Sequence, residues 1–139
     1  MRRDLRPEEL GDLLDRPLLA VLATRTGDGD VLLSPVWHEW TDGGFTVFTG
    51  ADDVKVRHLE RDPRASIVVC EQEPPYRGIE VRGEARLSKN GDTGTGRRIA
   101  ARYIGEDGAK GWIDPEDVLI RLEPGSLRVW DFADDYPAT

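Results

Sequence analysis

Short apolar segments separated by turn residues constrain the fold of this chain more than any other feature of its sequence. The segment PLLAVLAT (17–24) is followed by the turn residues GDGD and then by DVLLSPVWHEW (30–40). A second turn sequence, TDGG, leads into FTVFTG (45–50), in which alternate residues are apolar or aromatic. Runs of this length bounded by Gly and Asp are typical of β-hairpins.

The same pattern continues to the end of the chain, with short helices between the strands. We expect helices over 6–15, 51–63 and 96–104, and further strands over 65–72, 79–87, 117–124 and 126–132. Six or seven short strands in 139 residues predict a mainly β fold, a closed or nearly closed barrel with short flanking helices. With no internal repeat or long linker, residues 1–139 are expected to form a single domain.

Charge and cysteine content narrow the classes of function. The formal net charge of -8 argues against sequence-independent nucleic-acid binding, which needs a basic surface. One cysteine, Cys70, allows no intrachain disulfide. The first residues lack the apolar core of a signal peptide, and the longest apolar run, 18–23, is too short to span a membrane. We therefore expect a cytoplasmic protein without membrane contact.

Metal and nucleophilic chemistry have little support in the sequence. His38, His58 and Cys70 match no familiar zinc spacing, so we expect no metal site. Cys70 ends the apolar run SIVVC, which predicts a small buried core residue. For His38 we expect a hydrogen-bonded position at a strand edge. The sequence offers no acid–base constellation, and catalytic residues stay unknown.

A basic cluster interrupts the acidic chain. Residues 55–64 hold one lysine and three arginines against Glu60 and Asp62. If 52–60 is helical, Lys55 lies in the first turn, where the free N–H groups of the helix favour an anion. Such a cluster fits either a solvated helix face or an anion-binding site, and its spacing alone does not decide between them.

The segment SPVWHEW (34–40) carries two tryptophans and a histidine. On a strand, Val36 and His38 point to one side, whereas Pro35, Trp37 and Glu39 point to the other. One set would pack inside the barrel, and the other would face a ligand or a partner subunit.

Two sequence motifs resemble a known family. They are K-x-R-x-L-x-R-D-P-R-A-S at 55–66 and V-x-G-x-A at 81–85. Together with the order of strands from about residue 8 to 130, they resemble the pyridoxamine 5'-phosphate oxidase-like split-barrel family. The actinobacterial branch that uses flavin or deazaflavin coenzyme F420 is the most similar. The resemblance implies a split β-barrel homodimer with each cofactor in a cleft between two protomers.

The resemblance also implies roles for individual residues. The residues expected to bind the cofactor are Pro35, Val36, Trp37, Phe48, Thr49, Lys55 and Arg57. Tyr76, Arg77 and Trp130 are expected to border a small-molecule substrate. Members of the family often carry an extra Arg or Lys just before the lysine that holds the phosphate, but here Asp52 and Asp53 precede Lys55. The two carboxylates would either weaken phosphate binding or cap the helix.

The function implied by the resemblance is hydride transfer between reduced F420 and an electron-poor small molecule. An FMN-dependent oxidase or reductase on the same fold is the first alternative. A non-catalytic module that binds or senses flavin or haem is the second, favoured by the missing basic residue before Lys55. In this family the cofactor supplies the chemistry, and the protein supplies orientation and a dry pocket.

Overall fold

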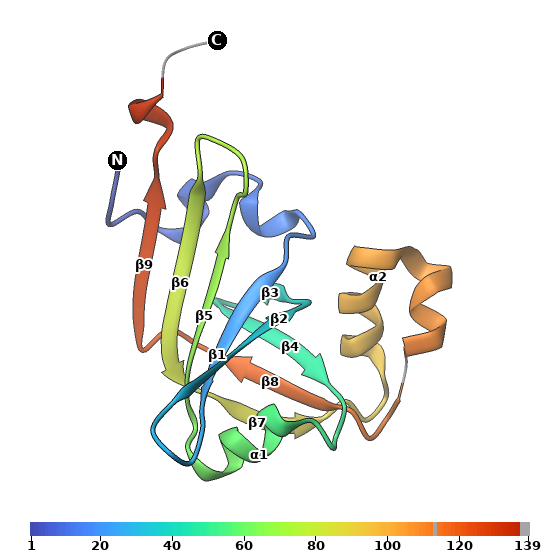
Figure 1. Ribbon diagram of the computed structural model, residues 1–139. Coiled ribbons are helices and arrows are strands. Elements are labelled where there is room, and N and C mark those ends of the chain that lie inside the picture. Colours follow the sequence, from blue (N-terminus) through green and yellow to red (C-terminus); the bar gives the residue numbers. More distant parts are fainter. Residues whose placement is uncertain (113, 137–139) are drawn as a thin grey trace.

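The computed structural model describes residues 1–112 and 114–136 (Figure 1). The chain is mainly β, with two antiparallel sheets and two α-helices, an arrangement consistent with a split barrel. One sheet has the order β2-β1-β5-β6-β9 and the other β3-β4-β8-β7. The strands are β1 (Ala20–Arg25), β2 (Val31–Val36), β3 (Glu39–Thr41), β4 (Gly44–Thr49), β5 (Arg64–Cys70), β6 (Arg77–Glu84), β7 (Arg86–Lys89), β8 (Val118–Leu122) and β9 (Ser126–Asp131). The helices are α1 (Val54–Arg61) and α2 (Gly94–Ala109), with short 3₁₀ turns η1 (Pro7–Leu10), η2 (Leu13–Asp15), η3 (Lys110–Trp112) and η4 (Ala133–Asp135).

The predicted turn sequences connect the hairpins. Asp42 and Gly43 join β3 to β4, and both have positive φ values, 50° and 75°. Two consecutive residues with positive φ form the type I′ turn, which matches the twist of an antiparallel pair. Gly43 meets this requirement at no steric cost, and Asp42 is one of the few other residue types that tolerate it. The GDGD segment lies between β1 and β2, which pair as predicted.

The core lies between the two sheets. Alternate residues of each strand point inward, so that Leu22, Ile67 and Val81 on one sheet face the other sheet. From that second sheet, Phe45 and Ile120 complete a single apolar cluster. Because side chains alternate with a period of two, the other face of the five-stranded sheet points away from the core.

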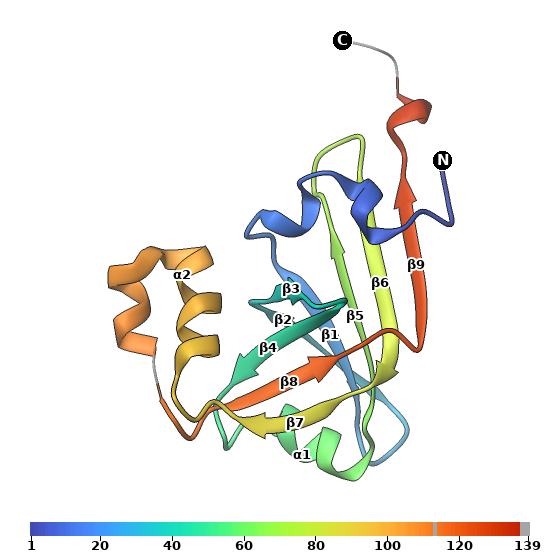
Figure 2. The same ribbon diagram turned by 180° about the vertical axis from the view of Figure 1, so that it is seen from behind.

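The two helices cover different parts of the barrel. In both views α1 lies at one end, next to β7, and α2 lies to one side, next to β4 (Figures 1 and 2). Asp53 caps the N-terminus of α1, since its side chain accepts a hydrogen bond from the backbone N–H of Lys55. The helix ends just before Pro63, as predicted. The second α-helix was expected to end at residue 104, but Gly105 only produces a kink and the helix continues to Ala109.

Three expectations about the N-terminal helix, the number of strands and the burial of Cys70 were wrong. Residues 6–15 form the two separate 3₁₀ turns η1 and η2, because Gly11 between them has a φ of 62°. The described residues contain nine strands, more than the six or seven expected, because 30–40 and 79–87 each divide into two. Cys70 is exposed, because the alternation that buries Ile67 and Val69 turns Cys70 to the outer face of β5.

Candidate functional site

A cleft of about 490 Å³ lies where the end of β2, the end of β4 and the start of α1 meet. This volume lies in the range typical of small-molecule sites. Its lining residues are Leu19, Pro35, Val36, Trp37, Phe48, Thr49, Gly50, Lys55, Trp112 and Asp117. Six of the seven residues predicted to contact a cofactor are therefore brought together around one cleft, although they come from three separate segments.

One side of the cleft, which we call the Trp37 wall, is formed by Trp37, Trp112 and Tyr103. The rings of Trp37 and Tyr103 stack at 5.1 Å between centroids, with an angle of 9° between their planes. Trp112 is tilted against Trp37 at 5.2 Å and is 56% exposed. Trp37 is therefore held by α2 on one face, while the more exposed indole of Trp112 offers apolar area to a ligand.

Side chains of α2 fix the backbone behind the Trp37 wall. The Tyr103 hydroxyl accepts a hydrogen bond from the backbone N–H of His38 at 3.0 Å and donates to the carbonyl of Leu18 at 2.8 Å. Burial raises the pKa of Tyr103, so this hydroxyl keeps its proton. The Arg102 guanidinium donates to the carbonyls of His38, Leu14 and Arg16. One helix thus ties together two chain segments that are far apart in sequence.

Glu39 and Arg98 add an ion pair to the same support. The Arg98 guanidinium donates two hydrogen bonds to the Glu39 carboxylate, at 2.7 and 2.6 Å. The Glu39 side chain is only 5% exposed, whereas that of Arg98 is 58% exposed. The hydrogen bonds to Glu39 raise the pKa of Arg98. The alternation of a strand predicts that Glu39 points to the same side as Pro35 and Trp37. In the structure the Glu39 side chain is buried against α2.

The expectation of a hydrogen-bonded His38 at a strand edge was wrong. The ring is fully buried between Phe45 and Tyr103, and neither ring nitrogen has a hydrogen-bond partner among the described residues. Burial, and then the nearby positive charge of Arg102, lower the pKa of His38 to about 4. The imidazole is therefore neutral at pH 7 and packs as a core side chain.

Another part of the cleft, which we call the Lys55 end, is lined by Thr49 and Lys55, and Asp53 is hydrogen-bonded to both. The Lys55 ammonium donates to Asp53 Oδ2 at 2.8 Å, and the Thr49 hydroxyl donates to the same oxygen at 3.0 Å. Burial alone would raise the pKa of Asp53, but the hydrogen bonds from Lys55 and Thr49 hold it below its ordinary value. The alternative that the carboxylate caps the helix is thus confirmed for Asp53, which also forms an ion pair with Lys55.

The remaining predicted residues lie outside the cleft. Arg57 is exposed, and its guanidinium donates to the backbone carbonyl of Asp52. Arg77 forms ion pairs with Glu71 and Asp12, both at 2.8 Å, and donates to the carbonyl of Leu10. It therefore joins the N-terminal turns to the end of β5.

Tyr76 and Trp130 also lie outside the cleft. Tyr76 packs edge-on against Tyr136, with 6.0 Å between the ring centroids. Trp130 covers Gly78 so closely that an added Cβ there would come within 2.3 Å of the indole. Trp130 lines a separate hollow of about 630 Å³ beside the N-terminus.

Two cleft residues were missed by reasoning from the sequence. Trp112 follows α2, which was expected to end at residue 104 but continues past Gly105. Nothing in the sequence therefore indicated that Trp112 would pack against Trp37. Asp117 lines the cleft just before β8, and burial together with the nearby Asp114 raises its pKa. The pairing of Asp53 with Lys55 was predictable from the sequence, because a capping side chain at 53 lies within reach of the first helical turn.

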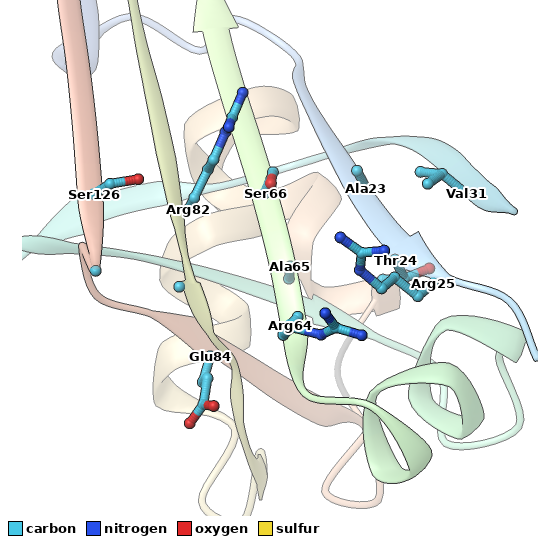
Figure 3. A pocket seen from close by; sticks show the side chains of 12 residues that line it. Ala23, Thr24, Arg25, Val31, Arg64, Ala65, Ser66, Arg82, Glu84 and Ser126 are labelled. Atoms are coloured by element: carbon cyan, nitrogen blue, oxygen red, sulfur yellow. The ribbon is translucent and has the colours of Figure 1, made fainter. Parts of the chain in front are cut away.

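A second hollow, of about 380 Å³, opens on the outer face of the five-stranded sheet (Figure 3). Arg25 and Arg64 lie near one another along its lining, whereas Arg82 and Glu84 point away in different directions (Figure 3). Arg64 is paired with Asp62 at 2.8 Å and Arg82 with Glu80 at 3.0 Å. This hollow contains none of the residues predicted for the cofactor.

Two features are absent from residues 1–112 and 114–136. This part of the chain has no group of three or more His, Cys, Asp or Glu side chains placed to hold a metal ion. Its helices are too short or too polar for any of them to cross a membrane.

The cleft has the donors and surfaces that a planar ring bearing a phosphate would need. Aromatic and apolar side chains line the Trp37 wall, and the Lys55 ammonium lies beside the first turn of α1. An ammonium has three N–H donors, and one of them is used by Asp53. Two remain for an anionic oxygen, so these residues fit a flavin or deazaflavin nucleotide.

Comparisons with known proteins agree with this fold. The model of the family described as pyridoxamine 5'-phosphate oxidase matches residues 7–131. A conserved hypothetical protein from Mycobacterium tuberculosis superposes with a TM-score of 0.82 at 23% identity, covering 97% of this chain and 91% of that one. An F420 reductase superposes with a TM-score of 0.69 at 26% identity, covering 88% and 98%.

A third solved structure shares the fold alone. It is the haem storage protein HutZ from Vibrio cholerae, with a TM-score of 0.68 at 19% identity over 90% of this chain and 94% of that one. A search of curated protein sequences returned no match.

Proposed function

The chain belongs to the pyridoxamine 5'-phosphate oxidase family, whose model spans residues 7–131, and on this premise we propose that it is an F420-dependent reductase. Its substrate would be an electron-poor small molecule. The observation that carries the proposal is the cleft itself, whose lining combines the aromatic residues Trp37 and Trp112 with Lys55. The likeness to an F420 reductase at 26% identity supports the choice of coenzyme.

Each part of the cleft has a distinct task in this proposal. Pro35, Val36, Trp37 and Phe48 contact the ring and exclude water, while Thr49 lies beside it. Lys55 binds the phosphate through the N–H donors that Asp53 leaves free. The bound coenzyme supplies the hydride, and the residues of the chain orient it and keep the site dry.

The proposal includes a homodimer, for which the outer face of the five-stranded sheet offers a surface. β2 is the edge strand of that sheet, and its outward side chains Val31 and Leu33 are 51% and 64% exposed. Leu19, 53% exposed, continues this apolar surface to the rim of the cleft. A second copy packed there would bury the apolar residues and close the open side of the cleft.

The same arrangement gives a role to residues outside the cleft. Trp130 of one protomer would reach the substrate bound to its partner, and Tyr76 and Arg77 would also border a substrate, as the family resemblance implies. The cytoplasm stays the expected location on the sequence arguments given above.

The experiment that tests the proposal is a titration of the purified protein with F420, FMN and haem, followed by intrinsic tryptophan fluorescence. Trp37 and Trp112 line the cleft, so an occupied cleft should quench their emission. We expect F420 to bind most tightly and the protein to sediment as a dimer. Tighter binding of FMN would instead assign the flavin-dependent alternative. Haem binding alone would assign the non-catalytic alternative, and a monomeric mass at micromolar concentration would contradict the shared cleft.

A further inference from the structure

The Asp53 carboxylate takes part in three hydrogen bonds at the Lys55 end. Its Oδ1 accepts from the backbone N–H of Lys55 at 2.9 Å. Its Oδ2 accepts from the Lys55 ammonium at 2.8 Å and from the Thr49 hydroxyl at 3.0 Å. The carboxylate therefore has two separable roles. One caps α1 and needs only an acceptor oxygen, and the other places a negative charge beside the ammonium.

The negative charge of Asp53 changes the net charge that the Lys55 end presents to a ligand. The Lys55 side chain is 13% exposed and that of Asp53 is 30% exposed, so the pair is partly shielded from water. The positive charge of Lys55 is offset by the negative charge of Asp53, and the pair has no net charge. Arg57 adds little, because its guanidinium is directed to the carbonyl of Asp52 and not into the cleft.

We infer that Asp53 determines which phosphate the cleft accepts, favouring a singly charged phosphodiester over a doubly charged phosphomonoester. F420 carries its phosphate as a diester, whereas FMN carries a monoester with a charge of about -2 above pH 7. The attraction of the Lys55 ammonium and the repulsion of the Asp53 carboxylate both grow with the ligand's charge, so Asp53 removes the advantage that Lys55 alone would give to the more highly charged phosphate. This inference rests on the proposed function, since it assumes a flavin or deazaflavin in the cleft.

The test is the substitution Asp53→Asn, which removes the charge and keeps the cap, because Asn caps helices about as well as Asp. Three ligands of increasing phosphate charge are titrated into wild type and variant: riboflavin, F420 and FMN. Tryptophan fluorescence reports binding, and each ligand is compared only with itself in the two proteins. Interactions of each ligand with groups other than residue 53 therefore cancel in the ratio.

The expected result is a tightening that scales with phosphate charge. Two unit charges a few ångströms apart in a water-like dielectric change binding about fivefold, so riboflavin should be unaffected, F420 should tighten about fivefold and FMN about 25-fold. The preference of the protein for F420 over FMN should fall by the same factor of about five. Raising the salt concentration should shrink these changes.

Asp52→Asn is the matched control. It removes the same charge one residue earlier, where the exposed side chain makes no hydrogen bond or ion pair with Lys55 in the structure. We expect it to change all three affinities by less than about twofold, because exposed charges are screened. Thermal melts of both variants in the absence of ligand confirm that the fold is intact, and Asp53→Ser, another good cap, repeats the test if the Asn variant does not fold.

The other outcomes overturn the inference. Equal tightening of F420 and FMN binding would mean that Asp53 weakens binding by the same factor whatever the charge of the phosphate. Unchanged affinities would mean that the ligand lies elsewhere. If Asp52→Asn changed the affinities as much as Asp53→Asn, the cause would be the overall charge of this surface and not the ion pair between Asp53 and Lys55. If none of the ligands binds to wild type, the proposed function fails and the inference fails with it; if they bind but the ratios do not follow charge, only the inference fails.

Discussion

The two parts of the cleft are built in different ways. The Trp37 wall is held by α2, through Arg98, Arg102 and Tyr103, whose contacts include the buried residues His38 and Glu39. The Lys55 end depends on one carboxylate, 30% exposed, that serves three donors. A substitution behind the wall should therefore change the free energy of unfolding, and a substitution at the Lys55 end should change ligand affinity.

The largest expected effect is on the stability of the wall. Arg98→Ala leaves the buried Glu39 carboxylate without its partner, which should lower the free energy of unfolding by about 3–5 kcal/mol. Arg97→Ala is the matched control, because it removes an exposed arginine one position earlier on the same helix. Urea unfolding of both variants measures the difference. Equal stability of the two would show that Glu39 finds solvent or another partner.

The second effect is a dependence of wall stability on pH. The pKa of His38 is about 4 in the folded protein and 6.5 in the unfolded chain. Because the unfolded state binds the proton more readily, stability is lost as the pH falls from 6.5 to 4, by about 3 kcal/mol in total. Unfolding of wild type and His38→Leu across this range isolates the contribution. The variant should lose less stability on acidification, and parallel curves would contradict the burial of a neutral imidazole.

The third effect belongs to the Lys55 end. Lys55→Ala removes a charge-assisted hydrogen bond to the phosphate, worth about 1.5–3 kcal/mol, and should weaken coenzyme binding roughly tenfold to a hundredfold. Because Asp53 keeps its hydrogen bonds from Thr49 and from the backbone N–H of residue 55, the melting temperature should change little. Titration beside a thermal melt checks both halves. Arg57→Ala is the control, because the Arg57 guanidinium is directed away from the cleft. An equal loss of coenzyme affinity in Arg57→Ala would place the phosphate outside the Lys55 end.

The smallest effect separates the two roles of Asp53. Asp53→Ala removes the cap and should lower the free energy of unfolding by about 1 kcal/mol, whereas Asp53→Asn should not. Thermal melts of the two variants without ligand give the comparison. If Asn also destabilises the protein, the charge of Asp53 contributes to folding, and the difference between the wall and the Lys55 end is smaller than described.

The sequence alone determined the local features. Alternating apolar residues and the turns at GDGD and TDGG fixed the positions of the hairpins, and an Asp before an apolar helical pattern fixed the cap of α1. These features depend on residues within a few positions of one another, so the local pattern is sufficient. The family resemblance named seven cofactor contacts, and six of them line one cleft in the structure, although their roles stay predictions.

Only the tertiary structure decided how distant segments meet. The apolar run SIVVC predicted a buried Cys70, but the side of a strand that faces the core is set by its pairing partners, and β5 in register with β1 and β6 turns Cys70 outward. The neutral, unpartnered state of His38 follows from the approach of Tyr103, 65 positions later. Trp112 reached the cleft because α2 runs past the kink at Gly105. Burial and long-range contacts are properties of the folded packing, and a short window of sequence contains neither.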